Sequence, residues 1–167
     1  MIIHCTRKLA AKLGQALESP QLEASLLGSW HAQLYMIDRR QCVFFCHDRT
    51  RYVLVLPGVV KDNLAELALL FRAVYLQSLA FEGINDAGIK KVSLAMGPQI
   101  FDAVTDRSVL SSLSVVRRDV DAYLADYAHI LDVDPFELMQ WLNQRPTMAR
   151  GRAIFPKHEM FELIATL

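Results

Sequence analysis

Apolar residues change their spacing along the chain, and each change marks a different kind of element. Three runs rich in β-branched and aromatic residues follow one another after Trp30, at 31–38, 41–47 and 52–57. The connections between these runs are short and charged, and short connections join only antiparallel neighbours. The sequence therefore predicts a three-stranded antiparallel meander over about 31–57, with 41–47 as its middle strand.

The register of the meander follows from its two connections. If Asp38 faces Gln41 and His47 faces Tyr52, apolar side chains line both faces of the sheet. One face would carry Leu34, Met36, Val43, Phe45, Leu54 and Leu56, and the other Tyr35, Ile37, Cys42, Phe44, Val53 and Val55. If one face of the meander were exposed to solvent, polar and apolar residues would alternate along each strand. Because both faces are apolar, helices or a second subunit must cover each of them.

A long apolar segment follows the meander and predicts a central helix over about 62–82. Its most apolar part, residues 64–81, is about long enough to cross a bilayer. Glu66, Arg72 and Gln77 lie along that stretch. We therefore expect a buried helix of a soluble protein, and no membrane association.

Further elements complete an α+β fold. Residues 2–5 suggest a short additional strand, which makes the meander three- to four-stranded, and residues 100–104 another. Residues 90–96 fit helix or strand, and short helices are expected after Thr6 and at Ser19-Pro20. Helical spacing predicts a helical C-terminal half, with helices beginning at Ser108, at Asp134-Pro135 and at Pro156. Because no repeat or linker interrupts the pattern, we expect one domain over residues 1–167.

Composition narrows the class of protein. The 167 residues are 53% hydrophobic and 22% charged with zero net charge, which excludes wholesale disorder and any global attraction to nucleic acid or membranes. The first residues lack the order of a secretion signal. Three cysteines form no paired framework, so we expect a cytoplasmic protein.

Several segments together resemble an uncharacterised bacterial family known only as a domain of unknown function. They are Met1-Ile2-Ile3-His4-Cys5-Thr6 with Lys8-Leu9, Trp30-His31-Ala32, Asp38-Arg39-Arg40 with Cys42, Asp48 through Thr50 and Tyr52 to Pro57-Gly58, Arg107-Ser108-Val109-Leu110, Asn143-x-x-Pro146, and Phe155-Pro156. Ser111 stands where the family pattern has glycine. The resemblance covers nearly the whole chain and bears on the fold and the domain boundaries. The family has no activity to transfer, so the resemblance leaves the function open.

One loop carries the residue types of acid–base or phosphoryl chemistry. The candidates are His31, His47, Asp48, Thr50 and Arg51. In the register above, His31 lies opposite Asp48. The alternative is structural: Asp48 and Thr50 make turn hydrogen bonds, Arg51 faces water, and a carboxylate fixes a histidine tautomer.

No metal or cofactor is expected. Cys42 and Cys46 are four residues apart, but on a strand this separates them by roughly 13 Å at about 3.3 Å per residue. They cannot chelate one ion together, so buried thiols are expected instead. The chain also lacks a phosphate-cradling glycine loop, a dinucleotide fingerprint and a nucleophile elbow.

The segment 145–157 is the best candidate for binding anions. It contains Arg145, Arg150, Arg152 and Lys157 and no acidic residue. Such a loop could bind phosphate or a nucleic-acid backbone. Its aromatic content is Phe155 alone, too little for a base-stacking platform, so a plain basic surface loop is the alternative.

These patterns favour a non-catalytic binding or regulatory module that acts through protein contacts, as a homodimer or with another protein. No recognisable catalytic set is present, so these patterns favour a protein that is not an enzyme. The alternative is a small nucleic-acid-binding or nucleic-acid-acting protein, which would use the basic segment 145–157 or the Asp48 loop. The apolar stripe of the last helix, which must dock on its own domain or a neighbour's, is the argument for the dimer.

Overall fold

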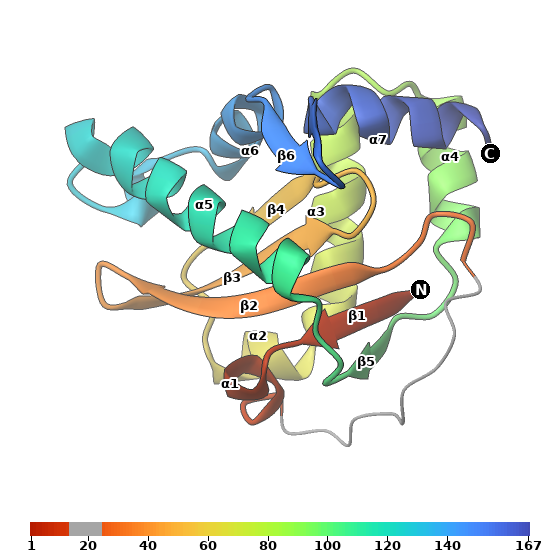
Figure 1. The fold of residues 1–167 in the computed structure, drawn as a ribbon. Helices are drawn as coiled ribbons and strands as arrows, with labels where there is room; N and C mark the ends of the chain where they lie inside the picture. Colours follow the sequence, from red (N-terminus) through yellow and green to blue (C-terminus); the bar gives the residue numbers. More distant parts are fainter. Residues whose placement is uncertain (14–24) are drawn as a thin grey trace.

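The computed structural model describes residues 1–13 and 25–167 (Figure 1). The helix expected at Ser19-Pro20 lies outside these described residues. Within the described part, five strands form one sheet in the order β4-β3-β2-β1-β5. Their bounds are β1 (Ile2–Cys5), β2 (Trp30–Ile37), β3 (Arg40–His47), β4 (Val53–Leu56) and β5 (Ile100–Asp102). The predicted α+β class is confirmed, but β1 runs parallel to both β2 and β5, so the sheet is mixed.

The meander has the predicted order, with β3 between β2 and β4. Phe44 and Phe45 point to opposite faces, and both side chains are fully buried. The register of β3 with β4 is as predicted, because Phe45 lies opposite Leu54.

The predicted register of β2 with β3 is wrong by two residues. Ile37 pairs with Arg40, and Asp38 and Arg39 form a two-residue connection with φ of 49° and 62°. Two successive positive φ values give the hairpin turn whose twist matches that of the flanking strands. Because the side-chain period of a strand is two, the slip leaves every side chain on its predicted face.

Helices of the same chain cover both faces of the sheet (Figure 1). On one face α3 (Leu67–Phe81) packs its Phe71 ring 5.2 Å from Trp30 and 5.0 Å from Phe45, measured between ring centroids. The other face is covered by α5 (Arg107–Tyr123), and α6 (Pro135–Asn143) packs along the edge strand β4. The two apolar faces predicted from the sequence are therefore buried without a second subunit.

The central helix lies where predicted but is divided in two. The chain forms α2 (Lys61–Ala65) and then α3, and Glu66 between them has φ −106° and ψ 21°. The remaining helices are α1 (Arg7–Ala10), α4 (Asp86–Ala95) and α7 (Pro156–Ala165), with single turns at Leu124–Asp126 and Ile130–Asp132. Among the described helices, none has the length and apolar character needed to span a membrane.

The segment 145–157 is a hairpin and not the simple loop expected. It contains β6 (Thr147–Ala149) and β7 (Arg152–Ile154), joined by Arg150 and Gly151 at φ of 49° and 79°. Three-residue strands are too short to show an alternating pattern, which is why the sequence did not reveal them.

The apolar stripe of α7 packs inside its own chain. Met160, Leu163 and Ile164 are all buried, and the hydroxyl of Tyr75 donates a hydrogen bond to the sulfur of Met160 at 3.1 Å. The stripe is therefore not a surface that needs a partner subunit.

Candidate functional site

The Asp48 side chain contacts His31 of β2 and Ser29, the residue just before that strand, at the end of the sheet. Its Oδ1 lies 2.6 Å from His31 Nδ1, and its Oδ2 accepts a hydrogen bond of 2.7 Å from the Ser29 hydroxyl. The strand partner of His31 is Cys46, whereas the N–H of Asp48 bonds to the carbonyl of Ser29. The contact between His31 and Asp48 thus forms although the register that suggested it is wrong, because the Asp48 side chain turns back along the strand.

The second nitrogen of His31 defines its tautomer. The N–H of Asp106, just before α5, donates to His31 Nε2 at 2.7 Å. Nε2 is therefore an acceptor, so Nδ1 carries the proton and donates it to Asp48. Burial alone would raise the pKa of Asp48, but the hydrogen bonds from His31 and Ser29 outweigh it and hold that pKa below its usual range.

His47 lies on the opposite face of the sheet from His31. It pairs with Trp30 in the β2–β3 register and shares the α3 face with it. Its Nε2 lies 2.6 Å from the Leu27 carbonyl, while Nδ1 accepts the Thr50 N–H at 3.1 Å and lies 2.8 Å from the Thr50 hydroxyl. Burial lowers the pKa of His47 to about 4, so the ring is neutral and serves the turn.

Arg51 leaves the same turn toward α5. One terminal nitrogen of its guanidinium donates to the carbonyl of Asp48, and the other donates to the Ser108 hydroxyl at 3.0 Å. The residue has φ 59° and is only 4% exposed, and its buried Nε–H has no hydrogen-bond partner. The five candidates therefore gather at one end of the sheet but do not converge, because His47 and Thr50 face α3 while His31 and Arg51 face α5.

Two residues that the sequence analysis did not single out extend the cluster across the sheet. His4 on β1 is the strand partner of both Asp102 on β5 and His31 on β2. Its Nδ1 lies 2.7 Å from Asp102 Oδ1, its Nε2 lies 3.9 Å from Asp48 Oδ2, and its ring centroid is 4.8 Å from that of His31. A histidine in an otherwise apolar strand was the available signal, but its partner is 98 residues away.

The three cysteines are buried and form no disulfide. Burial raises the pKa of Cys5 and of Cys46 to about 12, so both thiols stay protonated at neutral pH. Within residues 1–13 and 25–167, no group of three or more histidine, cysteine and acidic side chains is placed to hold a metal ion.

Most of the basic residues proposed for anion binding are engaged with acidic ones. Arg145 lies 3.5 Å from Asp119 and over the Trp141 ring. The remaining ion pairs are Arg152 with Glu159 at 2.8 Å and Lys157 with Glu82 at 2.6 Å. Arg150, at the hairpin tip, makes no ion pair with any described residue. Three of the four positive charges are thus offset within the protein.

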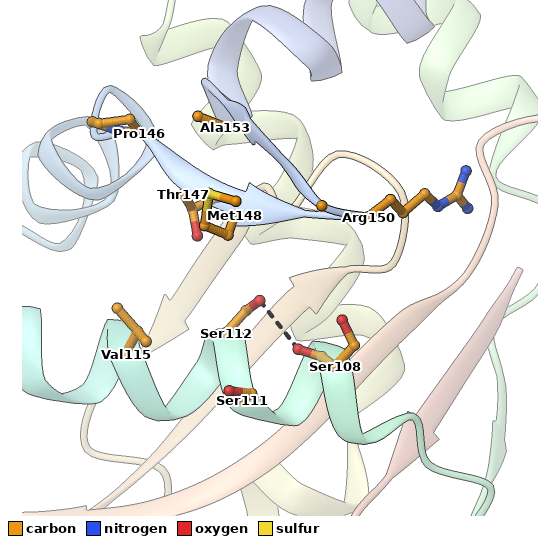
Figure 2. A pocket seen from close by; sticks show the side chains of 10 residues that line it. Ser108, Ser111, Ser112, Val115, Pro146, Thr147, Met148, Arg150 and Ala153 are labelled. Carbon is orange, nitrogen blue, oxygen red and sulfur yellow. Dashed lines mark hydrogen bonds between the residues drawn. The ribbon is translucent and has the colours of Figure 1, made fainter.

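A cavity of about 680 Å³ lies between α5 and the β6–β7 hairpin (Figure 2). We call it the α5–hairpin groove. Its lining residues are Ser108, Ser111, Ser112, Val115, Pro146, Thr147, Met148, Arg150, Gly151 and Ala153. An inner hollow of about 30 Å³ shares Ser112, Val115, Pro146 and Thr147 with the groove. Arg51 and Arg145 also line this hollow, and the Arg51 guanidinium donates to the hydroxyl of Ser108, a residue of the groove lining.

Comparison with protein families matches residues 2–159 to a domain of unknown function (DUF6933). The chain belongs to this family. The DUF6933 match runs from β1 into α7, so the histidine cluster and the groove both lie within the family domain. A search of curated proteins finds no match. Membership supplies no activity, and the function has to be argued from the site.

Proposed function

We propose that this protein is a single-domain, non-catalytic binding module that holds a small ligand in the α5–hairpin groove. The observation that carries the proposal is the groove itself, whose volume of about 680 Å³ falls within the range of ligand pockets, about 300–1,000 Å³. Its two walls come from separate parts of the chain, α5 and the hairpin. Val115 and Met148 expose apolar surface to it, and serine hydroxyls supply hydrogen-bonding groups.

The state of the two buried histidines supports a non-catalytic role. Both ring nitrogens of His31 and both of His47 already have hydrogen-bond partners within the protein. A general base needs a nitrogen that reaches the substrate directly or through one water. These rings therefore serve to hold the turn and the start of α5.

The groove can be tested with a fragment screen by NMR and a variant that fills it. Val115→Trp places an indole in the groove from α5, and Val104→Trp adds the same ring at an exposed position that does not line it. We expect fragments that bind the wild type to bind Val104→Trp and to be lost from Val115→Trp. Fragments that bind all three proteins equally would place ligand binding elsewhere.

Acid–base chemistry at His4 is the second candidate, favoured by one observation. Of the six ring nitrogens of His4, His31 and His47, His4 Nε2 is the one without a hydrogen bond to any described residue, and the His4 side chain is 14% exposed. Asp102 orients the ring from the other side at 2.7 Å. A hydrolase panel tests this: an activity lost in His4→Gln but kept in the exposed control His158→Gln would support an enzyme.

The nucleic-acid alternative has weaker support. Three of the four basic side chains of segment 145–157 are paired with carboxylates, which leaves fewer charges to neutralise phosphates. Any affinity for polyanions should be weak and fall steeply with salt.

We retain a homodimer, or contact with another protein, as a proposal. Exposed apolar side chains such as Leu26, Leu69 and Leu94 now support it instead of α7. Light scattering tests it: twice the chain mass of 18.9 kDa supports a dimer, and a mass near 18.9 kDa refutes it. The unpaired, buried thiols fit the proposed cytoplasmic location.

A further inference from the structure

We infer that the ligand of the α5–hairpin groove is a small amphipathic anion, with a carboxylate or phosphate group directed toward Arg51 and an apolar body along the groove. The inference rests on the proposed function, since it names the ligand class of the same site. Two independent features carry it, the unbalanced charge of Arg51 and the mixed lining of the groove.

Arg51 is a buried cation without a carboxylate partner in the described part of the chain. Its guanidinium donates to a backbone carbonyl and to the Ser108 hydroxyl, both neutral acceptors, and its Nε–H has no acceptor. Arginine is almost never fully buried unless paired, because an unbalanced buried charge is costly. An anion in the inner hollow that Arg51 lines would balance this charge.

The charges around the groove favour an anion as well. The charged side chains that line the groove and its inner hollow are Arg51, Arg145, Arg150 and Asp119. Asp119 already lies 3.5 Å from Arg145, so its charge is offset within the protein. Arg150 lies at the hairpin tip, at the end of the groove near Ser108, and its side chain points away from the other lining residues (Figure 2). The first turns of α5 also line the groove, and the helix dipole adds positive potential there.

The remaining lining residues of the groove favour a ligand with an apolar body. Val115 on α5 faces Pro146, Met148 and Ala153 across the groove, and Met148 is 61% exposed. Burying such a side chain on ligand binding is favourable in proportion to the apolar area removed from water. A ligand that consisted of a headgroup alone would leave this apolar surface exposed to water. An amphipathic anion would balance the charge of Arg51 and also cover the apolar lining.

Calorimetric titration with matched probes tests the inference. Octanoate and octyl phosphate supply the two headgroups on one chain, octanol is the neutral control, and inorganic phosphate is the headgroup alone. We expect at least one acidic amphiphile to bind roughly tenfold or more tightly than octanol, as a charge-assisted hydrogen bond provides. That preference should shrink with added salt, and inorganic phosphate should bind weakly.

Substitutions at the two arginines test which residue gives the preference for an acidic amphiphile over octanol. Arg51→Met should remove the preference for acid over alcohol, and Arg150→Ala should reduce it by a few fold, since an exposed charge contributes less. Arg51 also ties its turn to α5 through its guanidinium, so Arg51→Lys, which keeps the positive charge and removes the paired guanidinium contacts, separates loss of charge from loss of structure. Arg51→Lys should keep most of the preference, and thermal melting checks that each variant is folded.

The outcomes distinguish failure of the anion inference from failure of the proposed ligand-binding function. If octanol binds as tightly as the acids and Val115→Trp abolishes both, the groove binds ligands but the anion inference is wrong. If the preference is present in the wild type and survives in a folded Arg51→Met, Arg51 is not the anion site and the inference is also wrong. If no probe binds the wild type while fragments of the screen bind the groove, the inference is wrong and the proposed function stands. If neither probes nor fragments bind the wild type, or all bind Val115→Trp equally, the proposed function fails and the inference with it.

Discussion

The side-chain amide of Asn143 pairs with both backbone polar groups of Val53: Oδ1 accepts its N–H at 2.7 Å, and Nδ2 donates to its carbonyl at 3.0 Å. Val53 begins β4, which is an edge strand of the sheet, so these groups point away from β3. Asn143 is the last residue of α6 and is fully buried. The amide thus completes the sheet edge and positions Pro146, where the groove wall begins.

Replacing Asn143 with leucine should lower the free energy of unfolding by about 2–5 kcal/mol, because a buried donor and acceptor each lose their partner at about 1–3 kcal/mol. Urea denaturation measures this, and the exposed neighbour variant Gln144→Ala should change stability by less than about 0.5 kcal/mol. A loss below about 1 kcal/mol in Asn143→Leu would mean that water replaces the amide and that the pairing is incidental.

Replacing Phe45 with alanine should cost about 3–5 kcal/mol, as for other core phenylalanines. Phe45 is fully buried and packs against Phe71 with ring centroids 5.0 Å apart. Met36, on the same face of β2, is 48% exposed, so Met36→Ala is the matched control and should cost far less. Equal losses from the two variants would be inconsistent with the packing of α3 on this face.

Stability should fall as the pH is lowered from 6.5 toward 4, because of His47. Burial depresses its pKa from 6.5 to about 4 in the folded chain. Between these values the unfolded chain binds a proton that the folded chain does not, so acid favours unfolding. At about 1.4 kcal/mol per pKa unit, the full effect is about 3 kcal/mol.

The control for this pH effect is His47→Gln, which cannot titrate. Its unfolding free energy should be lower at pH 7 and flatter between pH 6.5 and 4. Asp48 acts in a different window, since its depressed pKa stabilises the fold above about pH 4 and that contribution is lost only in stronger acid. A wild-type slope that persists in His47→Gln would assign the effect to another group.

Features that depend on neighbours in the sequence could be predicted. The apolar faces of the meander were correct even though the β2–β3 register was wrong, since a slip of two residues preserves each face. The pairs His31–Asp48 and His47–Thr50 were also within reach, because tight turns bring them together. The same parity places His31 and His47 on opposite faces of the sheet, so their separation followed from the predicted register as well.

Features that join distant segments could not be predicted. The parallel pairing of β1 with β5 places His4 beside Asp102, and nothing local in either segment indicates it. The groove was missed for the same reason, because one wall is a hairpin with three-residue strands and the other is a helix some 35 residues earlier, counted from Val115 to Arg150. Segment 145–157 was predicted to bind anions because of its charge, whereas its hairpin structure forms one wall of the cavity.

Chelator treatment should leave the melting temperature unchanged. The thiols of Cys5, Cys42 and Cys46 are buried on separate strand positions and do not form a ligand set with histidines or carboxylates in the described residues. Differential scanning fluorimetry with and without EDTA measures this. A drop of several degrees would show that a metal contributes to folding through residues not brought together here.

The ion pair of Lys157 and Glu82 should matter for stability and not for anion binding. The Glu82 carboxylate is 1% exposed and lies 2.6 Å from the Lys157 ammonium. Removing one partner of a buried pair leaves an uncompensated charge, so Lys157→Met should cost about 3–5 kcal/mol. Arg152→Met is the matched control, because its pair with Glu159 is largely exposed and should be worth less than about 1 kcal/mol.

Adding Glu82→Gln to Lys157→Met should recover part of the loss, because the double variant no longer buries a charge. Urea denaturation of the wild type, Lys157→Met, Glu82→Gln and the double variant gives the coupling free energy between the two side chains. Polyanion affinity, measured on heparin at low salt, should be nearly the same in Lys157→Met as in the wild type, since that ammonium is already neutralised by Glu82. If Lys157→Met instead keeps full stability and loses heparin binding, Lys157 is free to bind anions, and the basic hairpin has to be considered again as a nucleic-acid surface.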